Sequence, residues 1–312
     1  MTPLVSVILP TYRRPDVLPS CLEGLERQTH PAVEVVVVDQ SPDDRSRQIV
    51  AARPPGAVHV RYLHSDVAGA SVARNLGMRA ASGSLFAFTD DDAIPEPRWI
   101  EGLVAAFQST PADLIGGRIL PLWEGERPCW FPDRRAYLVG IFDPGGPLAR
   151  FPRESLPMTG NLAVRRAVIE RLGGFDERAG PRPGRPISGE DSLFAWKALE
   201  AGLEVYYQPD AVVHHRVPRN RMTRKYYLRR SFLEGVSLVD VEERRGILTL
   251  ERVAELLDAH RKIRRERWLS ALGRVSIAPW RDPRLLSHLG EAALSSGIVS
   301  SCRRVLRERA EA

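Results

Sequence analysis

The chain has 312 residues, of which 43% are hydrophobic and 27% are charged, a composition typical of a folded globular protein. No apolar run approaches the roughly 20 residues that a bilayer-spanning helix needs, which argues against an integral-membrane enzyme. The net charge is +6, and the excess after about residue 215 favours an anionic partner. The chain begins without a basic segment and apolar core, so we expect no signal peptide and a cytoplasmic location. Cys21, Cys129 and Cys302 are widely spaced and are expected to be reduced thiols.

The first part of the chain alternates short apolar runs with helical patterns. Buried strands are predicted at residues 4–9, 34–39, 58–63, 85–89 and 114–119, and helices at 17–25, 70–81 and 99–108. Strands that alternate with helices at this spacing indicate a mostly parallel sheet built from strand–helix–strand units. We therefore predict an α/β fold.

The rest of the chain is less regular. Residues 121–157 are rich in Pro, Gly, Trp and Arg and are predicted to form a long loop that faces a substrate. Strands are predicted at 160–164, 203–207 and 211–215, with helices at 166–172 and 192–201. From about residue 222 the pattern is helical to the end, with a break near Pro279 and Pro283.

Three consecutive carboxylates, Asp90, Asp91 and Asp92, end the apolar run that starts at residue 85. Crowded acids repel one another and are costly to desolvate, unless a cation neutralises them. Their hard oxygen ligands suit Mg²⁺ or Mn²⁺, although a solvated acidic turn is the alternative. Asp39 also ends a predicted strand, and ligands of open α/β sheets bind at the carboxyl ends of strands. We expect the site on that edge of the sheet.

Five separated motifs carry a family resemblance. They are Val7-Ile8-Leu9-Pro10-Thr11-Tyr12, Val37-Val38-Asp39, Ala73-Arg74-Asn75, the acidic triplet with Pro95 downstream, and Gly189-Glu190-Asp191. In this order they resemble the family 2 glycosyltransferases over roughly residues 3–220. The resemblance implies the GT-A fold of nucleotide-diphospho-sugar transferases. It also implies an inverting transfer of a sugar from a nucleotide-diphosphate donor to a hydroxyl acceptor, in cell-envelope polysaccharide or glycoconjugate biosynthesis.

The same resemblance assigns roles to individual residues. It implies a catalytic base at Asp191, a contact to donor or acceptor at Glu190, and Mn²⁺ or Mg²⁺ held by Asp92 and His215. It implies nucleotide contacts at Pro10, Thr11, Tyr12, Arg13, Asp39, Arg74, Asp90 and Asp91. Thr159 or Asn161 is a further candidate for the donor sugar, and Trp123, Trp130 and Phe131 are candidates for the acceptor.

Each role has a structural alternative. The loop at residues 10–14 could instead be a simple strand–helix turn, Asp39 a helix or turn cap, and Arg74 a structural partner of Asp90 or Asp91. Glu190 and Asp191 suit the amino end of any helix. His215 could be an ordinary strand-end histidine, with His214 on the opposite face. The aromatic residues of the long loop could be core.

Three regions are predicted. Residues 1–118 should bind the nucleotide sugar, residues 119–220 should hold the acceptor and the catalytic base, and residues 221–312 should form a basic helical extension. Cations gather between Arg216 and Arg230 and again from Arg261 to Arg267, beside Trp268. They suit a diphosphate, a lipid-linked acceptor or an anionic membrane surface, so we expect peripheral contact with the inner membrane face.

Two other classes of protein share some of these sequence features. A sugar-phosphate nucleotidyltransferase also uses a nucleotide-binding α/β sheet, but the loop at residues 10–14 lacks the glycines of its signature. A non-catalytic protein could use the basic tail to bind an anionic partner. Nucleic acid is not expected, because the acidic edge of the sheet would repel phosphates.

Overall fold

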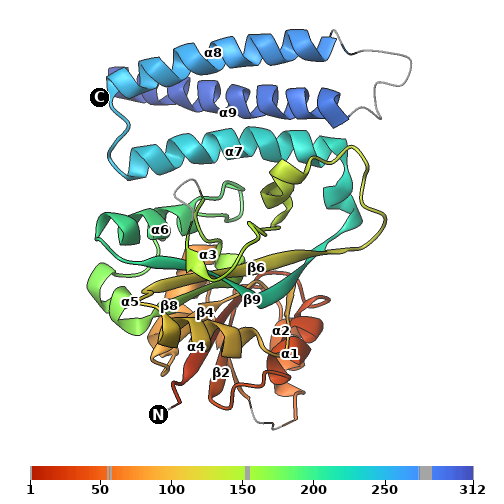
Figure 1. Ribbon diagram of the computed structural model, residues 1–312, viewed down its shortest axis with the longest axis vertical. Coiled ribbons are helices and arrows are strands. Elements are labelled where there is room, and N and C mark those ends of the chain that lie inside the picture. The colour runs from red at the N-terminus through yellow and green to blue at the C-terminus, as the bar shows by residue number, and fades with distance from the viewer. Residues whose placement is uncertain are drawn as a thin grey trace. The chain divides into compact units, whose positions relative to one another are not determined.

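The computed structural model describes residues 2–54, 56, 58–151, 155–272, 274 and 283–311. The chain forms two compact units, which we call the sheet unit and the helical unit. The sheet unit comprises residues 1–122, 141–185 and 190–216, and the helical unit residues 123–140, 186–189 and 217–312. Figure 1 labels the elements of both units.

The sheet unit alternates strands and helices along most of its length. In chain order its elements are β1 (Val5–Thr11), α1 (Leu18–Glu26), β2 (Val33–Asp39), α2 (Arg45–Ala51), β3 (His59–His64), α3 (Ala70–Ala80), β4 (Leu85–Phe88), β5 (Ala93–Pro95), α4 (Trp99–Ser109), β6 (Leu114–Trp123), β7 (Ala149–Arg150), a 3₁₀ turn (Thr159–Asn161), β8 (Leu162–Arg165), α5 (Arg166–Leu172), α6 (Glu190–Glu200) and β9 (Val205–Val217). The predicted α/β fold is confirmed.

Some elements differ from the sequence prediction. The strands predicted at 203–207 and 211–215 are one continuous strand, β9, which passes through Pro209 without a break. The first residues of the strand predicted at 160–164 form a 3₁₀ turn instead. The short strands β5 and β7 and the helix α2 were not predicted.

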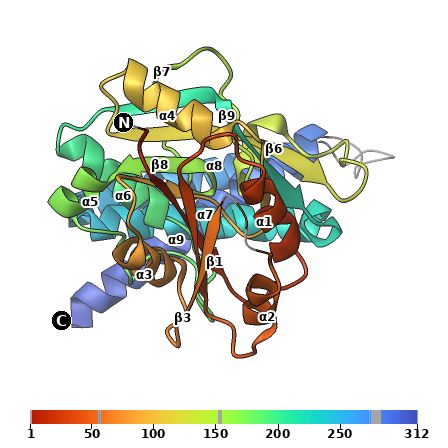
Figure 2. The same ribbon diagram turned by 90° about the horizontal axis from the view of Figure 1, so that it is seen from below.

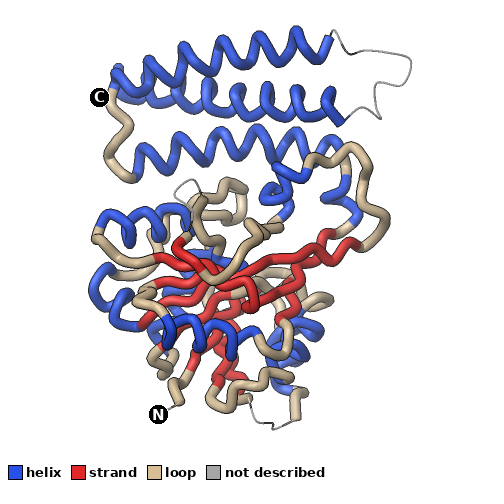
Figure 3. The backbone as a smooth tube through the Cα atoms, viewed as in Figure 1, coloured by secondary structure: helices blue, strands red, loops and turns tan. Residues whose placement is uncertain are grey.

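The strands, drawn in red in Figure 3, join one sheet in the order β3-β2-β1-β4-β8-β6-β9-β5, with β7 paired to β9. Strands β1 to β4 are parallel, as strand–helix–strand units require. Strand β8 is antiparallel to both β4 and β6, and β5 and β7 are antiparallel to β9. The parallel half therefore aligns its carboxyl ends at one edge.

Alternating side chains build a core on each face of this sheet. Val7 and Leu9 of β1 pack with α1 and α4 on one face, whereas Ile8 packs with α3, α5 and α6 on the other. Figure 2 shows α1 and α3 on opposite sides of β1. Both faces of a parallel strand are covered in this way, which is why these strands read as continuous apolar runs.

The helical unit contains α7 (Arg224–Arg244), α8 (Leu250–Leu272), α9 (Pro283–Glu311) and the 3₁₀ turns Asp133–Val139 and Arg219–Met222. Helix α9 packs on both α7 and α8 (Figure 1). Helices α7 and α9 approach closely at glycines, since a Cβ on Gly235 would lie 2.0 Å from the Leu294 carbonyl oxygen. The predicted helical extension is confirmed, but the predicted break at Pro279 lies outside the described residues.

Two predictions from composition also have structural outcomes. Within the described residues, none of the helices combines the length and the hydropathy that crossing a bilayer requires. All three cysteines are free thiols, as predicted; Cys21 and Cys302 are buried and Cys129 is exposed.

Asn161 ties the antiparallel half of the sheet together. Its amide oxygen accepts a hydrogen bond from Trp99 Nε1 at 2.8 Å. Its amide nitrogen donates to the carbonyl oxygens of Arg118 and Ala211, each at 2.8 Å. The Asn161 side chain is buried, and its amide oxygen and nitrogen are both hydrogen-bonded within the fold. This structural role explains the residue without a contact to the donor sugar.

We predict that Asn161→Ala lowers the free energy of unfolding by about 2–4 kcal/mol, because it leaves a buried indole N–H and two carbonyls unpaired. Urea denaturation measures this loss. Asn220→Ala, outside this network, is the control. Equal stability of the two variants would contradict the structural role.

Candidate active site

The parallel register brings the predicted site residues to one edge. Thr11 at the end of β1 pairs with Asp39 at the end of β2, and Ile8 pairs with Phe88, the last residue of β4. The acidic triplet therefore leaves β4 beside the loop that follows β1. The expectation that Asp39 and the triplet share one edge of the sheet is confirmed.

Arg14 is the counter-ion of the acidic triplet. Its Nη1 donates to Asp91 Oδ1 at 3.0 Å and to Asp92 Oδ2 at 2.8 Å. The hydroxyl of Thr11 donates to the other oxygen of Asp91 at 2.7 Å. Both carboxylates are buried, whereas 44% of the Arg14 side chain is exposed. One partly exposed guanidinium thus bridges two buried acids.

Sequence reasoning missed Arg14 and selected its neighbour Arg13. The two arginines are adjacent in the loop after β1, and only the backbone conformation separates their roles. Arg13 has a φ of 54°, uncommon for a residue with a side chain. Its guanidinium lies over the Tyr12 ring, 5.2 Å from the centroid, while Arg14 turns to the acids. The double arginine was the only signal in the sequence.

The electrostatics of the triplet follow from burial and crowding. Burial, together with the charges of Asp92 and Asp90, raises the pKa of Asp91 to about 6. Arg14 and the Thr11 hydroxyl oppose that rise. Burial by itself would lower the pKa of Arg14, but its attraction to Asp91 and Asp92 outweighs burial and raises that pKa above its ordinary value. The group is poised to accept another cation.

Arg74 links the triplet to the acids of α6. Its Nη1 lies 2.8 Å from Glu190 Oε1 and its Nη2 lies 3.3 Å from Asp90 Oδ1. Arg74 and Glu190 are both buried. Glu190 Oε2 is buried too, and within the described residues it accepts no hydrogen bond. A buried acceptor without a donor suits a hydroxyl of a ligand.

Asp191 occupies the first turn of α6, one residue after Glu190. Its Oδ1 accepts a hydrogen bond from the backbone nitrogen of Ser192 at 2.8 Å, and the residue is half-buried. The charge of Asp191 also contributes to raising the pKa of Arg74, which places the two residues in one electrostatic group. Both the catalytic and the helix-end roles are compatible with this position.

His215 reaches the triplet through an antiparallel pairing. Strand β9 pairs with β5, so that His215 lies opposite Ala93, the residue after Asp92. His215 Nε2 lies 3.3 Å from Asp92 Oδ1, and both side chains are buried. His214 points elsewhere, with its Nε2 2.8 Å from Glu96 Oε1, as alternation along a strand predicts.

The residues present fit a divalent cation that is held together with a substrate. Among the described residues, no three His, Cys, Asp or Glu side chains form a ready metal cage. Asp92 and His215 nevertheless offer adjacent oxygen and nitrogen ligands beside two further acids. Mg²⁺ sites commonly use one or two carboxylates and complete the shell with substrate phosphates and water. Imidazole with carboxylate also suits Mn²⁺.

Asp39 organises the loop at the end of β1 and β2. Its Oδ1 accepts from the Ser41 backbone nitrogen at 2.9 Å, and its Oδ2 accepts from the Tyr62 hydroxyl at 3.0 Å. Burial, aided by this bond to Asp39, raises the pKa of Tyr62 to about 12. The Arg13 backbone nitrogen in turn donates to the Ser41 hydroxyl at 2.7 Å. Asp39 therefore makes the turn-capping contact that is its structural alternative. This contact is compatible with a further contact to a nucleotide base.

Gly160 brings the backbone close to the triplet. A Cβ built there would lie 3.3 Å from Asp90 Oδ2, so a larger residue would crowd that carboxylate. The Gly160 carbonyl accepts from the Thr89 hydroxyl at 3.1 Å.

In the helical unit, Trp130 and Phe131 are buried against Tyr227, which agrees with the core alternative for these aromatic residues.

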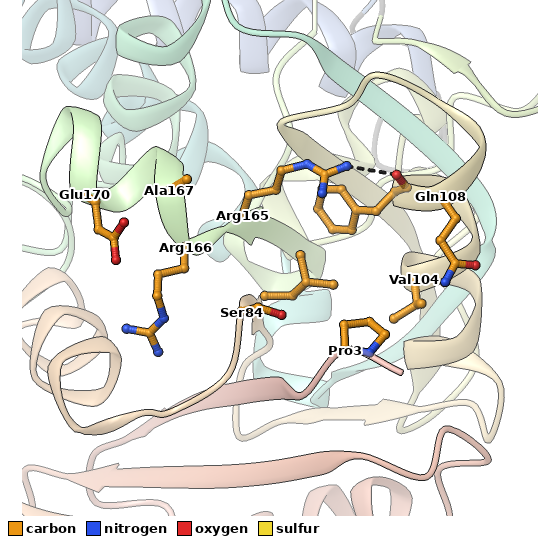
Figure 4. Close-up of a pocket in the computed structure, with 10 residues that line it drawn as sticks. Pro3, Ser84, Val104, Gln108, Arg165, Arg166, Ala167 and Glu170 are labelled. Atoms are coloured by element: carbon orange, nitrogen blue, oxygen red, sulfur yellow. Dashed lines mark hydrogen bonds between the residues drawn. The ribbon is translucent and has the colours of Figure 1, made fainter. Parts of the chain in front are cut away.

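A separate cavity of about 360 Å³ lies at the opposite ends of the strands, beside Pro3 and Ser84 (Figure 4). It contains none of the predicted site residues. Its arginines are used by the fold, since Arg165 donates to the Phe107 carbonyl at 2.8 Å and Arg166 to the Gly83 carbonyl at 2.7 Å. The acidic edge, rather than this cavity, is the candidate active site.

A sequence profile of the family described as Glycosyl transferase family 2 matches residues 6–173, just over half of the chain. The chain belongs to glycosyl transferase family 2. The matched range contains the loop after β1, Asp39, Arg74 and the acidic triplet, and it ends before α6 and β9. This family 2 protein is therefore a glycosyltransferase, and the sequence-based assignment of family and enzyme class is confirmed.

Curated relatives agree with the family. The chain is 27% identical to the glucosyl-dolichyl phosphate glucuronosyltransferase of Haloferax volcanii, over 75% of each protein. It is 30% identical to the glycosyltransferase AglE of the same organism, over 68% of this chain and 67% of that protein. Among solved structures, it resembles the mannosyltransferase PcManGT of Pyrobaculum calidifontis, solved with GDP-Man and Mn²⁺. The TM-score is 0.57 at 21% identity, and the match covers 100% of this chain and 76% of that one, which supports the GT-A fold.

We predict a pH effect on stability from Asp91. Because its pKa rises from 3.8 to about 6 on folding, its stabilising contribution is complete below pH 4 and is lost as the pH rises through 6. Relative to Asp91→Asn, the wild-type protein should lose about 2 kcal/mol of unfolding free energy between pH 4 and pH 7. Denaturant titrations in EDTA at both pH values measure the difference.

The matched control is Asp66→Asn, which removes a carboxylate that is 98% exposed. If wild type and Asp91→Asn show parallel stability profiles across this range, the burial argument for Asp91 is wrong.

Proposed function

We propose that this family 2 enzyme transfers a sugar, with inversion, from a nucleotide-diphosphate donor to the hydroxyl of a carbohydrate or lipid-linked acceptor. The observation that carries the proposal is the buried acidic edge, where the triplet and Glu190 are joined through Arg74. Buried charged groups with perturbed pKa values cluster at functional sites. The name of the Haloferax glucuronosyltransferase relative, which acts on a dolichyl phosphate derivative, supports a lipid-linked acceptor.

The nucleotide would lie along the carboxyl ends of β1, β2 and β4. Asp39, at the end of β2, is placed to meet the base or ribose, and the loop of Pro10, Thr11, Tyr12 and Arg13 supplies backbone and side-chain contacts. Asp90, Asp91 and Arg74 would lie near the ribose and diphosphate.

Asp92 and His215 would hold Mn²⁺ or Mg²⁺, and GDP-Man with Mn²⁺ in the PcManGT structure supports a divalent ion. When bound, the ion supplies charge neutralisation for the diphosphate, which makes the nucleoside diphosphate a better leaving group. Asp92 and His215 would contribute to this site only as the side chains that hold the ion.

Asp191 would act as the general base. Its carboxylate accepts the proton of the acceptor hydroxyl as that oxygen attacks the anomeric carbon, and the bond from the anomeric carbon to the diphosphate oxygen breaks on the opposite face. Glu190 Oε2 would accept a hydrogen bond from a sugar hydroxyl, since it is buried and lacks a donor in the described structure.

A cytoplasmic location stays a prediction from the sequence.

The first test identifies the donor. UDP-, GDP-, dTDP- and ADP-sugars are each added with Mn²⁺, with Mg²⁺ or with EDTA, and the thermal shift and calorimetric heat are recorded. We expect stabilisation by one nucleotide type, lost in EDTA, because ligand that binds only the folded state raises its stability. A folded protein that responds to none of them would contradict the donor site.

We predict that Asp92→Ala lowers turnover about a thousandfold or more, because it removes a ligand of the diphosphate-bound cation. The fold should remain, since Arg14 keeps Asp91 as its partner. Steady-state kinetics and Mn²⁺ titration in the presence of nucleotide measure the loss. Asp66→Ala, a change of an exposed acid, is the control. An active, Mn²⁺-dependent Asp92→Ala enzyme would contradict the assignment of Asp92 as a metal ligand.

We predict that Asp191→Asn keeps donor binding and lowers the transfer rate by about 10² to 10⁴, the usual contribution of a general base. Calorimetry with the donor and kinetics with the acceptor separate the two effects. Glu200→Gln, at the far end of the same helix, controls for the change of charge on α6. Loss of donor binding together with transfer would point to a structural role at the helix end.

A further inference from the structure

The last three turns of α8 expose an unusual combination of side chains. Arg261, Arg265, Trp268 and Leu272 recur at helical spacing and form one line along the helix, with Lys262 and Leu269 beside it. All six are exposed, and the exposed fractions are 50% for Trp268, 57% for Leu269 and 64% for Leu272. We call these six residues the α8 stripe.

The packing of the helical unit explains why the stripe is exposed. Helix α8 packs against α9 through Val253 and Leu257, and α9 separates it from α7 (Figure 1). Among the described residues, no other helix of the helical unit covers the opposite face of α8. Three large apolar side chains at its end are therefore left in contact with solvent, which soluble surfaces usually avoid when such residues are adjacent.

The cations of the stripe are not used by the fold. Arg261, Lys262 and Arg265 make no ion pair or hydrogen bond with any part of the chain that the structure describes. Arg252, at the other end of the same helix, is instead held by Glu242 and Glu255. The unused cations are free to meet an external anion.

Charge is also segregated along α8. Residues 250–258 carry Glu251, Glu255 and Asp258 against one arginine, whereas residues 261–272 carry five basic residues and one acidic residue. An anionic surface would attract the second half and repel the first. Contact should therefore involve the end of α8 rather than its full length.

The earlier basic segment is a weaker candidate for the same partner. Arg216 donates to the Ser20 hydroxyl at 3.0 Å, Arg219 to the Glu124 carbonyl at 3.0 Å, and Arg230 to the Ser188 hydroxyl at 3.2 Å. These side chains are already ordered by protein contacts. Their charge is less available than that of the α8 stripe.

We propose that the α8 stripe binds the anionic lipid surface of a membrane. The arginines and the lysine match lipid phosphates, the indole of Trp268 suits the headgroup boundary, and Leu269 and Leu272 suit the acyl region. A nucleic acid would match the cations but would leave the leucines without a partner. This contact is independent of the sugar-transfer proposal, so failure of one leaves the other standing.

The test is flotation of the full-length protein with phosphatidylcholine vesicles, with and without 30 mol% phosphatidylglycerol. We expect binding to the anionic vesicles at low salt and much weaker binding at high salt, because surface potentials are screened within a Debye length. Replacing Arg261, Lys262 and Arg265 by Gln should weaken binding about a hundredfold, from about fivefold per cation. The triple variant of Arg27, Arg303 and Arg307, also exposed, removes the same charge elsewhere and should bind normally.

The apolar part is tested separately. Trp268→Ala with Leu272→Ala should weaken binding at least about tenfold at both salt concentrations, whereas Leu238→Ala with Ile247→Ala, at other exposed apolar sites, should not. Circular dichroism and donor binding check that each variant is folded. No binding to anionic vesicles at low salt would overturn the proposal. The proposal would also be overturned if the stripe variants bound vesicles like their controls. Sedimentation showing that the stripe is a dimer interface, or that it binds RNA, would overturn it as well.

Discussion

The active edge of this glycosyltransferase depends on how buried carboxylates are neutralised. Asp91, Asp92 and Glu190 would each destabilise the fold if left without a counter-charge, and two arginines from separate elements prevent this. Arg14 binds the triplet from the loop after β1, and Arg74 binds it from α3. Under the proposed function, a donor diphosphate would add more negative charge to the same place, and these arginines alone would leave the site short of positive charge. The local architecture and the proposed need for a cation would therefore have one electrostatic origin.

Local sequence patterns were enough to predict the parallel half of the sheet and the acidic edge. Strands β1, β2 and β4 are buried on both faces, so their apolar runs are unmistakable, and the acids follow directly. The contact between His215 and Asp92 could not be derived in that way. It depends on the pairing of β9 with β5, a strand of three residues with no pattern of its own, across more than a hundred residues of chain. The family resemblance, rather than spacing, supplied His215.

Composition also could not distinguish side chains that the fold uses from those that it leaves available. Arg13 and Arg14 are equivalent in the sequence, and one left-handed backbone conformation decides which of them faces the acids. Asn161 looked like a ligand contact next to a glycine, yet its amide is consumed by three internal hydrogen bonds. The two basic segments of the tail also carry similar charge. Only the contacts of each side chain in the described structure distinguish the cations that have protein partners from those of the α8 stripe.

The helical unit is not a simple appendage at the end of the chain. It is assembled from three stretches, of which residues 123–140 and 186–189 are inserted between parts of the sheet unit. The second stretch is fastened to α7, since the Ser188 backbone donates to Ser237 and Arg230 donates to the Ser188 hydroxyl, and the chain then passes directly into Glu190. Cutting the protein after β9 would orphan both inserted stretches. Removal or exchange of residues 217–312 as one block would therefore also take away the partners of Ser188, two residues before Glu190.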